Sequence, residues 1–269
     1  MSLYAIGDLH LHFQSEVKAA DQRRDRLWRN HEDRLRRNCA GLITDDDTLV
    51  LVGDHSWGRK LAECEEDFAY IRAIPGRKIL LRGNHDHFWD VKKTASLNER
   101  FQPELFFLQD NFAAYRDYDF AVRRDDKGGA TDNVPAYRDY AIVGTKGFCF
   151  EGPFFIDRRG RILGWDEDKE EHAKALVERE LTRLRTSFEQ AKAAGYSKYI
   201  MFLHYPPTSV LEESSGFTDK AEEYGAEQVI YAHCHGEARF RDSLQGLYNG
   251  VYYRLVSGDY LRWTPARIL

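Results

Sequence analysis

The stretch Lys78–Asp86, KILLRGNHD, decides how the fold of this chain is interpreted. Its first half is a continuous apolar run, which is typical of a β-strand buried on both faces. Its second half, Gly83-Asn84-His85-Asp86, places an amide, an imidazole and a carboxylate directly after that strand. In an open α/β sheet, ligands bind at the carboxyl ends of the strands. The stretch therefore predicts a sheet strand that ends in a polar site.

Two earlier stretches follow the same plan. The apolar run Leu3–Gly7 is followed by Asp8 and His10, and the run Thr48–Gly53 is followed by Asp54. The alternation of short apolar strands with amphipathic segments predicts an α/β fold, and three such units imply a parallel sheet with crossover helices. The two helices expected between these strands are Ser15–Asn38 and Leu61–Ala73.

The second half of the chain repeats the alternation. Apolar residues recur at i+3 and i+4 over Asp168–Ala194, which predicts a long helix. His204 follows one expected strand, and His233 and His235 follow the next. The strands expected here are Lys198–Leu203, Gln228–Ala232 and Val251–Ser257.

The middle of the chain is expected to form a hairpin. Its arms would be Tyr118–Val122 and Tyr137–Val143, with a turn signal at Lys127-Gly128-Gly129. No shift in composition marks a domain boundary around it. We therefore expect one domain over residues 1–269, with a small hairpin insertion near residues 110–147.

The expected strand ends bring together side chains that can bind metal ions. They supply two carboxylates, four imidazoles and one amide, without a thiolate, which favours Mn, Fe, Zn or Co over Ca or Mg. Seven groups are more than one ordinary ion uses, whereas two ions sharing a bridging carboxylate would use them all. Two-metal sites of this kind hydrolyse phosphoesters through a hydroxide that bridges the ions. The seven residues are Asp8, His10, Asp54, Asn84, His204, His233 and His235.

These blocks, in this order, resemble the calcineurin-like metallophosphoesterase superfamily. The pattern D-x-H, G-D, G-N-H-(D/E), H and (G)-H-x-H extends from Asp8 to His235, which is most of the chain. The segments SLYAIGDLHL, LLRGNHDHFW, HYPPT and LVSGDYL also resemble a bacterial branch of predicted phosphohydrolases. The resemblance implies a four-layer α/β/β/α sandwich with mixed sheets.

The resemblance also implies a role for each motif residue. His85 would protonate the leaving-group oxygen or stabilise the transition state, and Asp86 would orient it. The first metal would be held by Asp8, His10 and His235, the second by Asn84, His204 and His233, and Asp54 would bridge the two.

The sequence departs from the family pattern at two positions. Trp57 stands where Asp or Arg is usual, and Ala232 stands in place of Gly. Neither change removes a ligand. Trp57 is a candidate to stack on an aryl group or nucleobase, although packing against the sheet is the more frequent use of such an aromatic side chain. Arg59 and Arg82 are candidates to clamp a phosphate oxygen, with a surface ion pair as the alternative.

Composition limits the partners. The chain of 269 residues has a net charge of −5, which argues against long nucleic acids and anionic membranes. Two divalent ions would outweigh the two site aspartates locally, so a small phosphorylated substrate is still attracted. No apolar run is long enough to span a bilayer, the N-terminus lacks a basic leader, and the four cysteines form no CxxC pair. We therefore expect a cytoplasmic protein, and the oligomeric state stays open.

Three functions remain open at this point. The first is a metal-dependent phosphohydrolase that cleaves a small phosphomonoester, as a phosphatase or nucleotidase does. The second is a phosphodiesterase that acts on a cyclic nucleotide or a similar small diester. The third is a non-catalytic, metal-bound interaction module, which the presence of His85 disfavours because such family members tend to lose that histidine.

Overall fold

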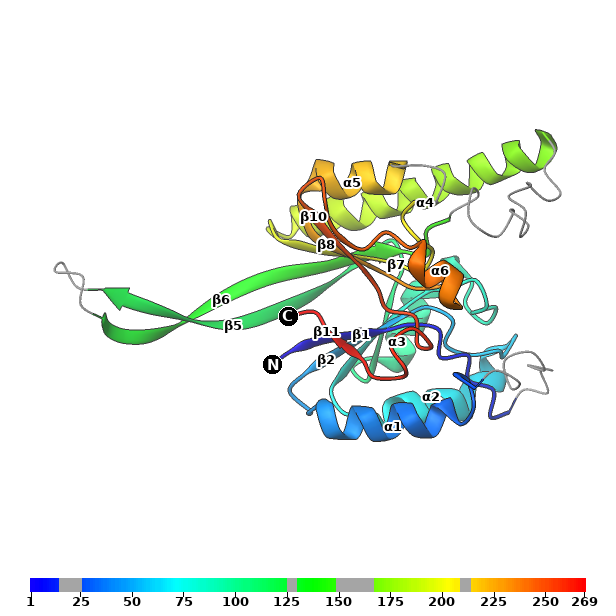
Figure 1. The fold of residues 1–269 in the computed structure, drawn as a ribbon, viewed down its shortest axis with the longest axis horizontal. Helices are drawn as coiled ribbons and strands as arrows, with labels where there is room; N and C mark the ends of the chain where they lie inside the picture. The colour runs from blue at the N-terminus through cyan, green and yellow to red at the C-terminus, as the bar shows by residue number, and fades with distance from the viewer. Residues whose placement is uncertain (15–25, 125–129, 149–166, 209–213) are drawn as a thin grey trace.

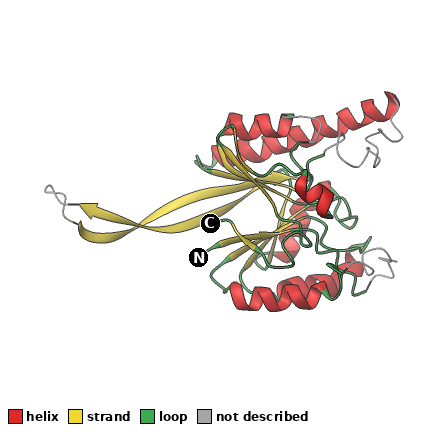
Figure 2. Cartoon of the chain, viewed as in Figure 1, coloured by secondary structure: helices red, strands yellow, loops and turns green. Residues whose placement is uncertain are grey.

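Two β-sheets lie face to face at the centre of the molecule, and helices cover the outer surface of each (Figures 1 and 2). The structure is a computed structural model that describes residues 1–14, 26–124, 130–148, 167–208 and 214–269. The order of layers is therefore helices, sheet, sheet, helices.

The first sheet has the strand order β11-β1-β2-β3-β4. Strands β1 to β4 run parallel to one another, and the short edge strand β11 pairs antiparallel with β1. All four parallel strands therefore end at the same edge. The bounds are β1 Leu3–Ile6, β2 Thr48–Val52, β3 Arg77–Leu81, β4 Leu105–Leu108 and β11 Ala266–Arg267.

The second sheet has the strand order β5-β6-β7-β8-β10-β9. Strands β6, β7, β8 and β10 are parallel, whereas β5 and β9 are antiparallel to their neighbours. Both sheets are thus mixed, with a parallel centre. The bounds are β5 Phe112–Arg124, β6 Ala130–Thr145, β7 Tyr199–Leu203, β8 Ala226–Tyr231, β9 Gly246–Tyr248 and β10 Val251–Leu255.

Strands β5 and β6 form the expected hairpin, which is longer than the sequence suggested and projects from the body of the molecule (Figure 1). The base of the hairpin is an edge of the second sheet, because residues 141–145 of β6 pair with β7. The predicted turn at residues 127–129 lies outside the described residues. The extent of the domain and the insertion over residues 110–147 stay predictions.

The helices cover the sheets in two groups, α1 to α3 on the first sheet and α4 and α5 on the second (Figure 1). Two short 3₁₀ helices, η2 and η3, precede α2 and α3. The bounds are α1 His31–Leu42, η2 Leu61–Cys64, α2 Glu65–Arg72, η3 Val91–Lys93, α3 Thr94–Phe101, α4 Glu167–Ala193, α5 Gly216–Tyr224 and α6 Glu237–Arg241.

The first predicted helix, Ser15–Asn38, was placed too early. Residues 26–30 form turns, α1 begins at His31, and residues 15–25 lie outside the described part. Asn30 has a left-handed backbone, with φ of 50°, which a helix cannot continue through. The carbonyls of Leu27 and Trp28 accept side-chain bonds, from Trp263 Nε1 at 2.6 Å and from the His31 ring at 3.0 Å, instead of helical N–H groups.

Three buried apolar clusters separate the four layers. One joins the first sheet to its helices, one lies between the sheets, and one joins the second sheet to α4 and α5. Strand β2 serves two of them, since Leu49 and Leu51 face the helices and Val50 and Val52 face the other sheet. This double burial explains the continuous apolar runs in the sequence. The predicted four-layer α/β/β/α sandwich with mixed sheets is confirmed.

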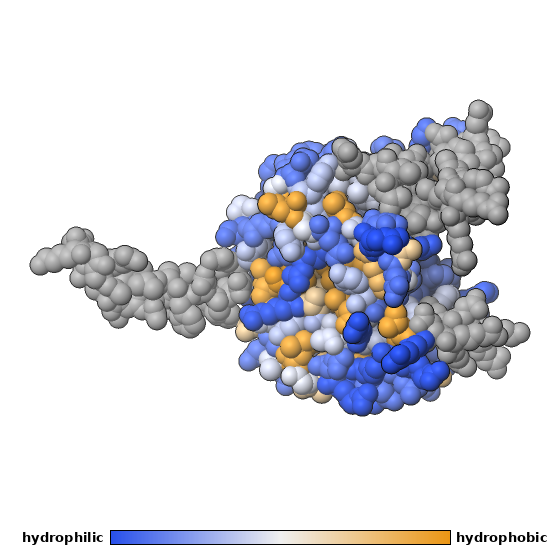
Figure 3. Space-filling view, viewed as in Figure 1, coloured by the Kyte–Doolittle hydropathy of each residue, from blue (hydrophilic) through white to orange (hydrophobic). Residues whose placement is uncertain are grey.

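The outer surface shows little sign of a large apolar face. In the view of Figure 3, hydrophilic residues predominate and hydrophobic residues appear in small separate groups. Among the helices in the described ranges, none is long and apolar enough to cross a bilayer.

Candidate metal centre

The loops that follow β1 and β2 are tied to each other by backbone hydrogen bonds. The amide of Asp8 donates to the carbonyl of Gly53 at 3.0 Å, and the amide of His10 donates to the carbonyl of Asp54 at 2.8 Å. These bonds hold the side chains of Asp8, His10 and Asp54 at one edge of the first sheet. All three residues are almost completely buried.

The backbone at this edge is unusual. Asp8, His10, Asp54 and His233 all have positive φ angles, between 46° and 69°, although none is a glycine. The chain at Asp8 and at His10 is therefore left-handed and not extended. Such conformations cost on the order of 1–3 kcal/mol each and are concentrated at functional sites.

One group of potential ligands consists of Asp8, His10 and His235, whose donor atoms lie within 4.8 Å of one another. Asp8 Oδ2 accepts the amide N–H of His233 at 3.0 Å, which leaves Oδ1 facing the group. His235 Nδ1 lies 3.0 Å from Asp259 Oδ1, and its Nε2 lies 3.7 Å from Asp8 Oδ1. These are three of the seven ligands expected from the sequence.

A second group consists of Asp54, His204 and His233, again with donor atoms within 4.8 Å of one another. His204 Nδ1 bonds to the Val52 carbonyl at 2.9 Å, so its Nε2 faces the site. That Nε2 lies 2.8 Å from Asn84 Oδ1 and 3.1 Å from His233 Nδ1. Asn84 therefore joins this group, and all seven expected residues lie in the two groups.

Asp54 lies between the two groups. Its Oδ1 accepts the amide N–H of His85 at 2.8 Å. Its Oδ2 lies 3.6 Å from His10 Nε2 in the first group and 3.4 Å from His204 Nε2 in the second. A single carboxylate oxygen thus faces nitrogen donors from both sides.

The donor set fits two divalent cations. Among the described residues, Asp8 Oδ1, Asp54 Oδ2 and His10 Nδ1 are buried atoms without a hydrogen-bond partner. An unsatisfied buried polar atom costs about 1–3 kcal/mol, more when it is charged, and a bound cation removes that cost for the carboxylates. Carboxylate, imidazole and amide groups are all donors to ions such as Mn and Zn.

Two of the candidate histidine ligands are in the protonation state that suits metal binding. Burial lowers the pKa of His10 and of His233 well below the usual value for histidine, so both rings are neutral and can donate a lone pair. Burial raises the pKa of Asp8 to about 6. For His204, burial acts to lower the pKa, but Asp54 and Asp8 outweigh it and raise the value to about 9. The two aspartates therefore attract a positive charge to this site.

Two glycines allow the loops to approach each other this closely. A Cβ on Gly83 would lie 2.1 Å from Asp54 Oδ1 and 2.2 Å from the Asp54 amide nitrogen. A Cβ on Gly53, whose φ is +85°, would lie 2.3 Å from His204 Nδ1. A side chain at either position would push a ligand out of place.

Asp86 does not orient the His85 ring, which corrects the expectation from the resemblance. Its buried carboxylate accepts backbone N–H groups from Gly83 at 2.7 Å, His55 at 2.8 Å and Asp54 at 3.0 Å. Its oxygens are thus turned toward the loops and bind them to each other. Asp86 therefore stabilises the two loops of the site and does not position His85, the proposed general acid.

The ring of His85 is held by an aromatic neighbour instead. Its centroid lies 4.3 Å from that of Trp57 and 5.5 Å from that of His10, and the residue is partly exposed. Trp57 also stacks on His10, at 5.1 Å with an interplanar angle of 28°. Of the predicted substrate residues, Trp57 is therefore at the site.

The two predicted arginines are placed differently. Arg82 Nε donates to the Trp89 carbonyl at 2.7 Å, so its side chain folds against the loop that carries Asn84 and His85. Arg59 is exposed, and its side chain makes no hydrogen bond or ion pair with the described residues. Only Arg82 is thus fixed next to the candidate ligands.

Asp259 is a site residue that the sequence reasoning missed. It follows β10 within Gly258-Asp259, as Asp8 and Asp54 follow β1 and β2 after a glycine. The Gly258 amide donates to the Gly7 carbonyl at 3.1 Å, which brings Asp259 beside His235. This third occurrence of Gly-Asp after an apolar strand could have identified Asp259 from the sequence. A carboxylate on the far nitrogen fixes the orientation of a metal-binding histidine.

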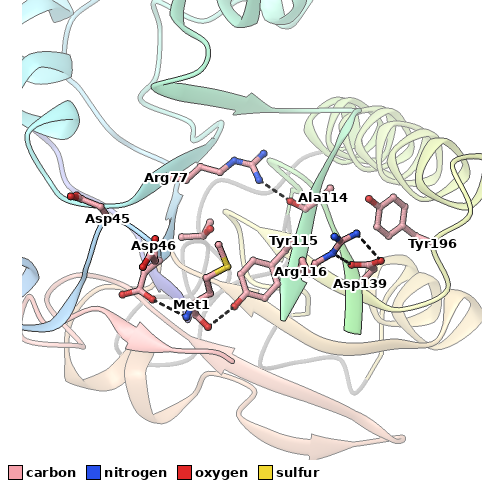
Figure 4. Close-up of a pocket in the computed structure, with 11 residues that line it drawn as sticks. Met1, Asp45, Asp46, Arg77, Ala114, Tyr115, Arg116, Asp139 and Tyr196 are labelled. Atoms are coloured by element: carbon pink, nitrogen blue, oxygen red, sulfur yellow. Dashed lines mark hydrogen bonds and ion pairs between the residues drawn. The ribbon is translucent and has the colours of Figure 1, made fainter. Parts of the chain in front are cut away.

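A separate cavity of about 390 Å³ lies near the start of β1 and the base of the hairpin (Figure 4). Four of its charged groups form ion pairs: Arg116 with Asp139 at 2.7 Å, and the N-terminal amine with Asp47 at 3.9 Å. Arg77 donates to the Ala114 carbonyl. The cavity includes none of the seven candidate ligands and is not part of the metal centre.

Residues 1–237 match the model of the family described as calcineurin-like phosphoesterase. The match covers every motif block from Asp8 to His235. None of the curated protein sequences compared with the chain matches it.

Solved structures give more distant likenesses. The phosphopantetheinyl hydrolase of Mycobacterium tuberculosis is 16% identical with a TM-score of 0.52, over 100% of this chain and 95% of that one. A protein of unknown function from Aquifex aeolicus is 13% identical with a TM-score of 0.47, over 99% and 95%. The 5'-nucleotidase of Candida albicans is 14% identical with a TM-score of 0.38, over 87% and 42%. At 16% identity, the first likeness shows a shared fold alone.

Proposed function

Because this chain belongs to the calcineurin-like phosphoesterase family, we propose that it is a two-metal phosphohydrolase that acts on a small phosphoester. The observation that carries the proposal is the position of Asp54 Oδ2, between a nitrogen donor of each ligand group. The unpartnered Asp8 Oδ1 supports it further.

The ligands would divide between the ions according to the two groups. Asp8, His10 and His235 would hold one ion, and Asn84, His204 and His233 the other, with Asp54 shared. When bound, two such ions lower the pKa of water and stabilise the charge of the transition state. The mixed nitrogen and oxygen donors favour Mn, Fe, Zn or Co.

The residues of the chain would contribute positioning and proton transfer. Asp259 and the Val52 carbonyl would orient His235 and His204 through their Nδ1 atoms. The partly exposed His85 ring, held against Trp57, would give a proton to the leaving-group oxygen. The pKa of His85 is lowered mainly by burial, which makes its protonated form a stronger acid.

A substrate panel tests this proposal. Mn-loaded protein is assayed with p-nitrophenyl phosphate, bis-p-nitrophenyl phosphate and a set of nucleotides. Hydrolysis of the first indicates a phosphomonoesterase, and hydrolysis of the second indicates a phosphodiesterase. The absence of hydrolysis throughout, with Mn shown to be bound by elemental analysis, would contradict the proposal and favour the non-catalytic module.

A further inference from the structure

Four cationic side chains gather on the side of the candidate centre that carries Asn84 and His204. Arg82 follows β3 and Lys146 follows β6, while Arg179 and Arg183 lie one turn apart on α4. Glu180 lies between these two arginines in the sequence and accepts the hydroxyl of Thr145, the residue before Lys146, and Arg82 is in electrostatic range of both arginines. These four residues, named here the basic cluster, therefore share one region of space.

The acids nearby do not neutralise the basic cluster. The buried Glu180 forms an ion pair with Arg183, lies 3.9 Å from Arg179 Nε and accepts the hydroxyl of Thr145. Asp110 lies in electrostatic range of Arg183, and Asp86 lies in range of Arg82. Among the described residues, three acids against four cations leave an excess of about one positive charge. Cations held this close without enough acids are typical of an anion-binding site.

Lys146 is the cation that most lacks a partner. Among the residues that the structure describes, its ammonium group makes no hydrogen bond or ion pair and lies over the rings of Tyr205 at 5.3 Å and Phe148 at 5.8 Å. The three arginines of the basic cluster are in electrostatic range of this ammonium group and repel it, despite Glu180. An anionic ligand would relieve this repulsion.

The basic cluster is directly connected to the candidate ligands. The Lys146 carbonyl accepts the amides of His204 at 3.1 Å and Tyr205 at 3.0 Å. The Tyr205 ring packs on His233 with centroids 4.2 Å apart. Two ring contacts thus separate the Lys146 ammonium from a candidate metal ligand, a span that one metabolite-sized molecule can cover.

We propose that the basic cluster is a subsite for a second phosphate group, so that the preferred substrate is a small phosphoester whose leaving group carries another phosphate. This inference rests on the proposed function. The guanidinium forks of Arg179 and Arg82 suit phosphate oxygens, and Lys146 supplies a compact charge. Arg183 remains on Glu180 and holds α4 in place.

Kinetics with matched substrates test the subsite. Adenosine 3',5'-bisphosphate is compared with adenosine 3'-monophosphate and 5'-monophosphate on the metal-loaded protein. The bisphosphate is expected to have a kcat/KM about tenfold above the better monophosphate, as expected for charge-assisted hydrogen bonds. Lys146→Met and Arg179→Gln should each remove most of that ratio, mainly through KM. Arg185→Gln, an exposed arginine of the same helix, should retain it.

Binding provides a second readout that does not depend on turnover. In the metal-loaded His85→Ala protein, calorimetry should give a Kd for the bisphosphate about tenfold weaker when Lys146→Met is added. Equal kcat/KM values for the bisphosphate and a monophosphate, or an unchanged Kd, would overturn the subsite. A lack of hydrolysis with every substrate would instead contradict the proposed function, and the calorimetry would still decide the subsite.

Discussion

At the scale of single residues, the position of Asp54 explains most of the site. One of its oxygens accepts the His85 amide, and the other faces His10 and His204. The backbone of Gly83 lies close to this carboxylate, since a Cβ there would lie 2.1 Å from Asp54 Oδ1. The orientation of this carboxylate is therefore fixed by both loops.

The substitution Asp54→Asn should disturb both metal ions at once. If the amide oxygen keeps the bond from His85, the NH₂ group faces the metal positions and cannot bind a cation. Elemental analysis should find less than two ions per chain, and turnover should fall at least a hundredfold, as for the loss of a central catalytic group. A variant that keeps a complete dinuclear site would refute the bridging role.

The substitution His85→Ala should leave the metal content unchanged and lower only the turnover. His85 contacts Trp57 and lies beside His10 but belongs to neither ligand group, so both ions should remain bound. Turnover should fall by about 10²–10⁴, the usual contribution of a general acid. His172→Ala, an exposed histidine of α4, is the matched control and should retain wild-type turnover. Loss of an ion from His85→Ala would contradict this assignment.

Sequence motifs pointed to the candidate ligands more completely than to the residues that support them. The seven candidate ligands were proposed because their types and spacing form a pattern along the chain, and the structure brings them into two groups. Asp259 was missed because its partner, His235, is fixed by a contact between β10 and the β1 loop, which only the fold creates. The role of Asp86 was misjudged for the same reason, since its partners come from a neighbouring strand end.

At the scale of elements, the loops after β2 and β3 act as one unit joined by Asp86. This buried carboxylate accepts three backbone N–H groups at 3.0 Å or less. The ends of these two parallel strands are thereby held together, which fixes the positions of Asp54 and Asn84 in the loops that follow them. A residue first assigned to catalysis therefore stabilises the structure.

The substitution Asp86→Ala should lower the free energy of unfolding by about 3 kcal/mol or more, because three buried N–H groups lose an ionised acceptor. Asp90→Ala is the matched control. Asp90 is exposed and accepts a single N–H, from Lys92, so its loss should cost about 1 kcal/mol or less. Urea denaturation measures both. Equal effects in the two variants would contradict the structural role of Asp86.

The strands were predicted where both faces are buried, and less well where they are not. The runs that became β1, β2, β3 and β7 are mostly apolar because each strand contributes side chains to two of the buried clusters. The edge strands β9 and β11 are only three and two residues long, too short to show a pattern. The start of α1 depended on side-chain bonds to Leu27 and Trp28, which no helical period reveals.

At the scale of the whole molecule, the two sheets bring distant parts of the chain to one edge. Candidate ligands at residues 8–84 come from the first sheet, and those at residues 204–235 come from the second. Neither sheet holds a complete set, because each ligand group combines residues of both. The net charge of −5 is that of the whole chain, whereas two bound cations would make the proposed site locally attractive to phosphate.

The most direct test of this account is the rate of phosphoester hydrolysis as Mn is titrated into metal-stripped protein. The substrate is the one that the wild-type protein hydrolyses fastest in the panel. We predict almost no activity without metal, a rise until two equivalents of Mn are bound per chain, and loss of activity when a chelator is added. Full activity in the presence of the chelator, or saturation at one equivalent, would contradict a two-metal site bridged by Asp54.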